Sequence, residues 1–132
     1  SLVKDIPEHP RTPKSEALLQ LACSRINKVS WNRILHDTET PRAYANAEAA
    51  LAQAELPLDK FLAEYAMAYS MIFLPNYGDK AKMLHHLTEA KRWFDEVPGK
   101  TDEAWRYFLH TGLLKAVLDA DPIFAPILAT AP

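Results

Sequence analysis

Residues 65–78 read YAMAYSMIFLPNYG, and between Ala66 and Leu74 only Ser70 interrupts a run of apolar side chains. A helix that spans a membrane needs about 20 mainly apolar residues, and this run is much shorter. Charged residues also come shortly before it, at Asp59, Lys60 and Glu64. We therefore expect a buried helix at the centre of a bundle and no membrane span.

Length and composition favour a single all-α domain. The chain has 132 residues, and at this length one hydrophobic core can be buried without a second domain. Its hydrophobic fraction of 48% and charged fraction of 24% are close to the averages for globular proteins. Glycine occurs only three times, and alanine and leucine are abundant, which favours helices over strands.

The ten prolines divide the chain into intervals that carry apolar residues at helical spacing. Proline is tolerated in the first turn of a helix and disrupts a helix interior. The sequence therefore predicts an all-α fold, a compact bundle of five main helices with a short C-terminal turn or helix after them. The five helices are expected at about residues 13–36, 41–55, 58–74, 80–97 and 102–120.

The N-terminal residues differ in pattern from the rest. Three prolines among the first 13 residues favour extended backbone, so residues 1–11 are predicted to form an extended N-terminal arm. Residues 12–132 are predicted to form a single helical domain. The first helix is expected to end near Asp37, and periodicity leaves open whether it is continuous through Ser30.

Two small residues are predicted to allow close helix packing. Ala47 belongs to a stripe of mostly small residues in the second predicted helix. Gly112 lies inside the fifth predicted helix, where glycine costs about 1 kcal/mol relative to alanine. We expect a close helix crossing to compensate for that cost.

The sequence predicts no catalytic residue, no cofactor and no metal ion. His85 and His86 are adjacent in a predicted helix, so their side chains point about 100° apart and cannot chelate one ion. His86 and Glu89 could share a face, but the further carboxylates of a helical metal site are not apparent. The single cysteine, Cys23, lies in an apolar helical stripe and is expected to be a buried, inert thiol.

Cysteine usage and charge narrow the location and the partners. One cysteine cannot form an internal disulfide, which is typical of a cytoplasmic protein. The basic residues near Trp31 resemble a nucleic-acid reader only superficially, because Ile26 falls where a helix-turn-helix requires glycine. Nucleic acid is therefore not an expected partner.

The preferred hypothesis is a non-enzymatic helical protein that acts by binding another protein, as a regulator, inhibitor, antiactivator, immunity-type factor or chaperone does. A bundle this small can fully surround only about one helix, and the third predicted helix is apolar nearly all round. Methionines suit adaptable contact surfaces, and symmetric dimers are the commonest oligomers. We therefore predict a homodimer with an interface at Met67, Met71 and Phe73.

The alternative hypothesis is a small-molecule-binding protein or an enzyme with a pocket between the helices. His85, His86 or His110 would lie at the edge of that pocket. The aromatic residues expected to line it are Tyr65, Tyr69, Trp93, Trp105 and Phe108. Packing of a hydrophobic core explains the same aromatic residues with fewer assumptions.

Overall fold

A computed structural model describes residues 17, 19–26 and 36–131 of the chain. All the regular structure in these ranges is helical and none of it is β-strand, which confirms the all-α prediction. Residues 17 and 19–26 are helical, and the predicted N-terminal arm and Ser30 lie outside the described residues. The other helices are α2 (His36–Gln53), α3 (Pro57–Met71), α4 (Lys80–Phe94), α5 (Asp102–Leu109), α6 (Gly112–Ala120) and α7 (Ala125–Leu128), with 3-10 turns η2 (Pro75–Tyr77) and η3 (Pro122–Phe124).

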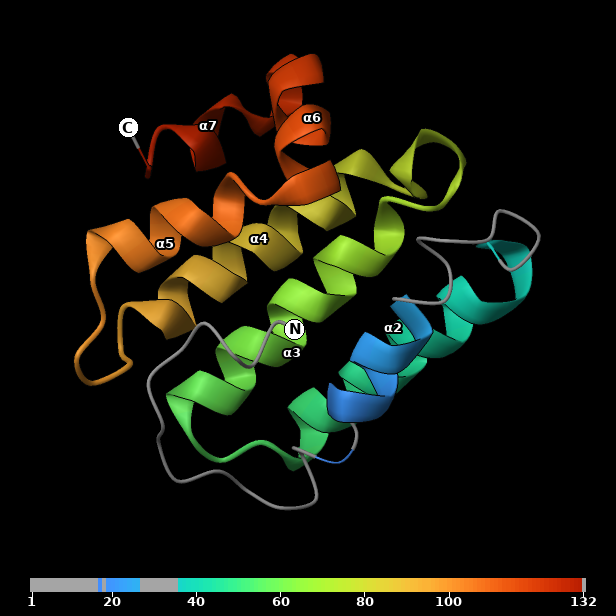
Figure 1. The fold of residues 1–132 in the computed structure, drawn as a ribbon, viewed down its shortest axis with the longest axis horizontal. Helices are drawn as coiled ribbons and strands as arrows, with labels where there is room; N and C mark the ends of the chain where they lie inside the picture. The colour runs from blue at the N-terminus through green and yellow to red at the C-terminus, as the bar shows by residue number, and fades with distance from the viewer. Residues whose placement is uncertain (1–16, 18, 27–35, 132) are drawn as a thin grey trace.

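Helix α3 lies at the centre of the bundle, with α2 along one side and α4 along the other (Figure 1). Every residue from Phe61 to Ala68 is buried, which covers the whole circumference of the helix. A helix surrounded in this way can be apolar on all sides, which explains the apolar run between Ala66 and Leu74. None of the described helices is both long enough and apolar enough to cross a membrane.

Helix α2 begins at His36, before the predicted start at residue 41, and contains Pro41 in its interior. The predicted end of the first helix near Asp37 is therefore wrong, because Asp37 lies in α2. The dihedral angle that proline imposes is compatible with a helix, and its missing N–H removes one backbone hydrogen bond. Thr40 consequently lies within the helix and does not cap it.

The predicted ends of the third and fourth helices, at residues 74 and 97, lie about one turn too far along the chain. Helix α3 ends at Met71 and α4 at Phe94. The following residues tighten into 3-10 turns, in which the amide of Leu74 donates to the carbonyl of Met71 and the amide of Val97 to that of Phe94. Sequence periodicity does not separate such turns from a continued helix.

The fifth predicted helix, residues 102–120, is two helices, so the predicted count of five is inexact. The buried hydroxyl of Tyr65 donates to the carbonyl oxygen of Phe108 at 2.6 Å. Burial raises the pKa of Tyr65, which keeps this donor protonated. In a continuous helix that carbonyl would accept from the amide of Gly112. Tyr65 therefore occupies the acceptor at which α5 ends.

Gly112 is the first residue of α6 and has a φ of +50°, in the left-handed region that favours glycine. Its role is thus to redirect the backbone between α5 and α6, which differs from the predicted helix crossing. A Cβ at this position would lie 3.4 Å from the hydroxyl oxygen of Tyr69. Ala47, the other predicted close-packing residue, is completely buried in α2.

The C-terminal elements fold back onto α4 and α5, in agreement with the predicted C-terminal turn or helix. The Lys80 ammonium lies 2.5 Å from Oδ2 of Asp121, while Oδ1 of Asp121 accepts the amide of Ile123. The hydrogen bond from Lys80 lowers the pKa of Asp121 and raises that of Lys80, so both groups are charged at neutral pH. Trp105 also donates its indole N–H to the hydroxyl of Thr130 at 2.9 Å.

The variant Gly112→Ala tests the break between α5 and α6. A left-handed backbone costs a non-glycine residue about 1–2 kcal/mol, so we expect the free energy of unfolding to fall by about 1 kcal/mol. A glycine inside a continuous helix predicts the opposite sign, a gain of about 1 kcal/mol on substitution by alanine. Urea unfolding followed by circular dichroism measures the difference. Ala116→Gly, at an exposed position inside α6, is the control, because it measures the cost of glycine inside a helix. Stabilisation by Gly112→Ala would contradict the break between α5 and α6.

Candidate functional site

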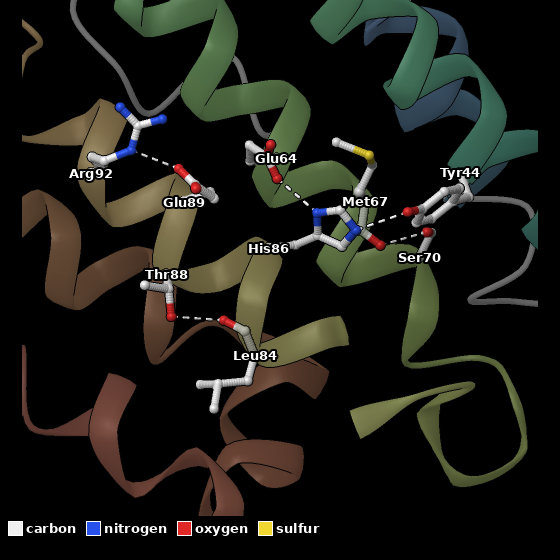
Figure 2. A network of polar contacts seen from close by, with 9 residues as sticks. All are labelled: Tyr44, Glu64, Met67, Ser70, Leu84, His86, Thr88, Glu89 and Arg92. Atoms are coloured by element: carbon white, nitrogen blue, oxygen red, sulfur yellow. Dashed lines mark hydrogen bonds and ion pairs between the residues drawn. The ribbon is translucent and has the colours of Figure 1, made fainter. Parts of the chain in front are cut away.

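A network of polar side chains joins three helices inside the bundle (Figure 2). Oε2 of Glu64 in α3 lies 2.7 Å from Nδ1 of His86 in α4. The hydroxyl oxygen of Tyr44 in α2 lies 2.8 Å from Nε2 of the same ring. Glu64 and His86 are only 6% and 8% exposed. We call these three residues the Glu–His–Tyr network.

The chemistry of the three groups determines how the network is oriented. An ionised carboxylate only accepts hydrogen bonds, so Nδ1 of His86 carries the proton that it donates to Glu64. In the neutral ring Nε2 is then an acceptor, and the hydroxyl of Tyr44 donates to it. Every member of the network thus has a partner, which offsets the cost of placing polar groups in the interior.

The ring of Tyr44 is held between two residues of α4. Lys82 and His86 lie one turn apart on the same face of this helix. The Lys82 ammonium lies 4.9 Å from the centre of the Tyr44 ring, within range of a cation–π contact. The His86 ring meets the Tyr44 ring edge-on, with 5.6 Å between centroids. These contacts fix the ring in addition to its hydrogen bond.

Tyr44 also forms part of the wall of a cavity with a volume of about 330 Å³. This volume lies at the lower end of the range for small-molecule sites. The cavity lies where the first half of α2 meets the connection between α3 and α4. Its lining residues are Thr40, Pro41, Tyr44, Met71, Leu74, Gly78, Asp79 and Lys82.

The connection between α3 and α4 brings Gly78 and Asp79 to the rim of the cavity. Asn76, Tyr77 and Gly78 have consecutive positive φ angles of 53°, 58° and 69°. The positive φ at Gly78 favours glycine, and a Cβ there would lie 3.0 Å from a methyl group of Leu74, which would have to shift to make room. Asp79 then caps α4, because its Oδ1 accepts the backbone N–H of Lys82 at 3.2 Å.

Thr40 adds an unusual polar group to the cavity wall. Its side chain is 1% exposed, and within the described part of the chain its hydroxyl oxygen has no hydrogen-bond partner. A buried polar group in this state costs about 1–3 kcal/mol. The cost is borne at a residue that lines the cavity.

The three residues predicted to form an interface, Met67, Met71 and Phe73, are covered by their own chain. Their side chains are 1%, 3% and 8% exposed, because residues of the same chain surround them. This burial removes the reason for placing an interface at these three positions. Met71 also lines the cavity. Self-association of the protein stays a prediction.

The aromatic residues predicted to line a pocket mostly fill the core. Phe61 has edge-to-face ring contacts with Trp105 and Phe108, with centroids 6.2 Å and 5.0 Å apart. Tyr65 packs into the same cluster. Trp93 is half-buried, and its ring is in cation–π contact with both Lys60, at 4.3 Å, and Arg92, at 4.2 Å. These rings therefore pack against each other or against cations.

The three histidines proposed for the edge of a pocket have separate positions. His86 contacts the cavity wall through Tyr44, whereas His85 is exposed and His110 caps the end of α5. Glu89, which could share a face with His86, is 2.6 Å from Arg92. No cluster of three possible metal ligands occurs in the described ranges. Cys23 is buried, and burial raises the pKa of its thiol.

Glu64, Tyr44 and Lys82 were not predicted as site residues from the sequence. One signal was present, since Glu64 is a charged residue within a helix that is apolar all round and must find a buried partner. Comparisons of the chain with protein-family models, curated proteins and solved structures gave no match. No related protein therefore assigns a role to the network or the cavity.

Substitutions in the network test its contribution to stability. His86→Ala leaves the buried Glu64 carboxylate without its partner, and we expect the free energy of unfolding to fall by about 3 kcal/mol. Glu64→Gln keeps an oxygen that can accept from His86, so the expected loss is about 1 kcal/mol. Chemical unfolding measures both. His85→Ala, an exposed neighbour, should change stability by less than about 0.5 kcal/mol; equal small losses for both histidines would show that the network is not stabilising.

Proposed function

We propose that this protein binds a small molecule in the cavity beside Tyr44. The observation that supports the proposal most is that a buried polar network holds one wall of a surface cavity in place. A contact between helices can be made by apolar residues without such a network, often at no loss of stability. A rigid wall is what a binding site requires, because an ordered site loses less entropy when a ligand binds.

The composition of the cavity also supports this function. Small-molecule sites combine a mainly apolar lining with a few polar groups that orient the ligand. Here Pro41, Met71 and Leu74 offer apolar surface, and Lys82 offers a charged group. The hydroxyl of Tyr44 is occupied by His86, so the tyrosine offers its ring to an occupant. This arrangement favours binding over proton transfer by Tyr44.

A fragment screen observed by amide NMR spectra of the protein tests the proposal. We expect saturable shifts at Tyr44, Met71, Gly78 and Lys82. Leu74→Trp should fill the cavity and weaken binding of the same fragments by about tenfold, a loss typical of a displaced apolar contact. Leu51→Trp, at a half-buried leucine of α2 outside the cavity lining, is the matched control. Shifts that cluster elsewhere, or that persist in Leu74→Trp, would contradict binding at this cavity.

A second proposal, protein–protein binding with a homodimer as its simplest form, has a separate observation in its favour. Tyr107 of α5 and Leu113 of α6 are large apolar residues with exposed fractions of 49% and 47%. Large apolar side chains that are exposed in the single chain can contribute to a contact surface. This proposal moves the interface from α3 to the α5–α6 corner.

Light scattering coupled to size exclusion measures self-association. For the homodimer we expect a mass of twice the chain at micromolar concentration. The pair Tyr107→Ser and Leu113→Ser should give a monomer with unchanged helicity, because both residues are exposed in the single chain. Leu56→Ser, at another exposed leucine, is the control. A monomeric wild-type protein at all concentrations would remove the homodimer.

A further inference from the structure

We infer that the occupant of the cavity is an amphiphilic anion, a small molecule with an apolar body and one carboxylate-like group that Lys82 binds at the rim. This inference rests on the proposed binding function and names its ligand class. It depends on the partners of the charged groups at the rim, the position of α4 and the shape of the apolar lining.

The two charged residues at the rim differ in how their charges are satisfied. Asp79 uses a carboxylate oxygen to accept the backbone N–H of Lys82 at the start of α4. The Lys82 ammonium forms no ion pair with a carboxylate of the described residues, and its contact is the face of the Tyr44 ring. An aromatic face attracts a cation but leaves the hydrogen-bond donors of an ammonium available. At the rim, the Lys82 ammonium is thus available to a ligand, whereas one carboxylate oxygen of Asp79 already accepts a hydrogen bond.

Other lysines of the bundle show the contrast. Lys80 pairs with Asp121, Lys91 with Asp95 and Lys115 with Asp119. Lys82 lies on α4 between the first two of these, on the side of the helix that faces the cavity. Lys60 likewise contacts an aromatic ring, that of Trp93, and forms no ion pair within the described residues, but it lies outside the cavity lining. Lys82 is the lysine of this kind at the cavity, where a ligand could supply a carboxylate.

The start of α4 adds to the preference for an anion. This helix has 15 residues, and the partial positive charge at its N-terminus favours negative groups nearby. The Asp79 carboxylate opposes a second anion, but its capping hydrogen bond draws one oxygen toward the helix amides. A cationic ligand would meet both Lys82 and the helix N-terminus, and these act against it.

The remaining lining calls for an apolar body. Met71, Leu74 and Pro41 surround the space inside the rim, and the Tyr44 ring closes one side. A short alkyl or aryl carboxylate fits this combination of a cationic rim and an apolar interior.

The experiment compares three probes with the same alkyl chain and different head groups: octanoate, 1-octanol and octylammonium. Binding to the full chain is measured by calorimetry and by amide NMR shifts, below the concentrations at which the probes aggregate. We expect octanoate to bind about tenfold more tightly than octanol, as one charge-assisted hydrogen bond provides, and octylammonium to bind most weakly.

The variant Lys82→Gln keeps a long polar side chain and removes the charge. It should reduce octanoate affinity about tenfold, to the level of octanol, and leave octanol affinity unchanged. Lys115→Gln, at an exposed lysine of α6 remote from the cavity lining, should change neither. Both lysines are exposed, so loss of the Lys82 contact with Tyr44 or of the Lys115 pair with Asp119 should lower the free energy of unfolding by no more than about 1 kcal/mol.

The outcomes separate this inference from the function on which it rests. Octanoate selectivity that disappears in Lys82→Gln supports it. Preferential binding of octanol or octylammonium at the cavity, or octanoate binding unchanged in Lys82→Gln, overturns the anionic ligand class and leaves the binding function standing. Binding of none of the three probes, together with a fragment screen without shifts at the cavity, overturns both.

Discussion

The hydrogen bond between Glu64 and His86 is the constraint on which the arrangement of the central helices depends. A carboxylate on the middle helix of a bundle is removed from water and needs a donor from a neighbouring helix. His86 of α4 supplies that donor at 2.7 Å, which fixes the register of α4 against α3. The second ring nitrogen then needs a partner of its own, and Tyr44 of α2 provides it. One buried charge thus relates three helices to each other.

The cavity follows from the same contacts. Tyr44 is directed inward by its hydrogen bond to His86, and its ring therefore turns a face toward Lys82, one helical turn away. The connection from α3 to α4 closes the space from the other side, through Leu74 and Gly78. Tyr44 therefore belongs both to the polar network in the interior and to the wall of the cavity at the surface.

Much of the fold could be predicted from the sequence, because it depends on local patterns. Apolar spacing identified the central helix, and the proline-bounded intervals located the starts of α3, α4 and α5 to within about one residue. The errors arise where a residue distant in the sequence determines where a helix ends. The break before Gly112 depends on Tyr65, which takes the carbonyl of Phe108 from a different helix. Periodicity within residues 102–120 contains no information about that hydrogen bond.

The candidate site was less predictable for the same reason. The sequence identified His86 as a candidate pocket-edge residue, but its partners lie 22 and 42 residues away in the chain. Burial of Met67, Met71 and Phe73 likewise depends on how closely α2 and α4 approach α3. An apolar pattern predicts that a side chain will be buried. Only the assembled bundle determines which residues cover it.

Several residues that violate local rules lie at or beside the cavity, which supports a functional reading. Pro41 lies in a helix interior, and Thr40 beside it has a buried hydroxyl without a partner among the described residues. Gly78, which also lines the cavity, ends a run of three residues with positive φ. The unpartnered hydroxyl of Thr40, the missing backbone donor of Pro41 and the positive φ of Asn76 and Tyr77 each cost stability. Sequences that fold well keep such local conflicts mainly at functional sites, where an occupant rather than the fold itself gives them their use.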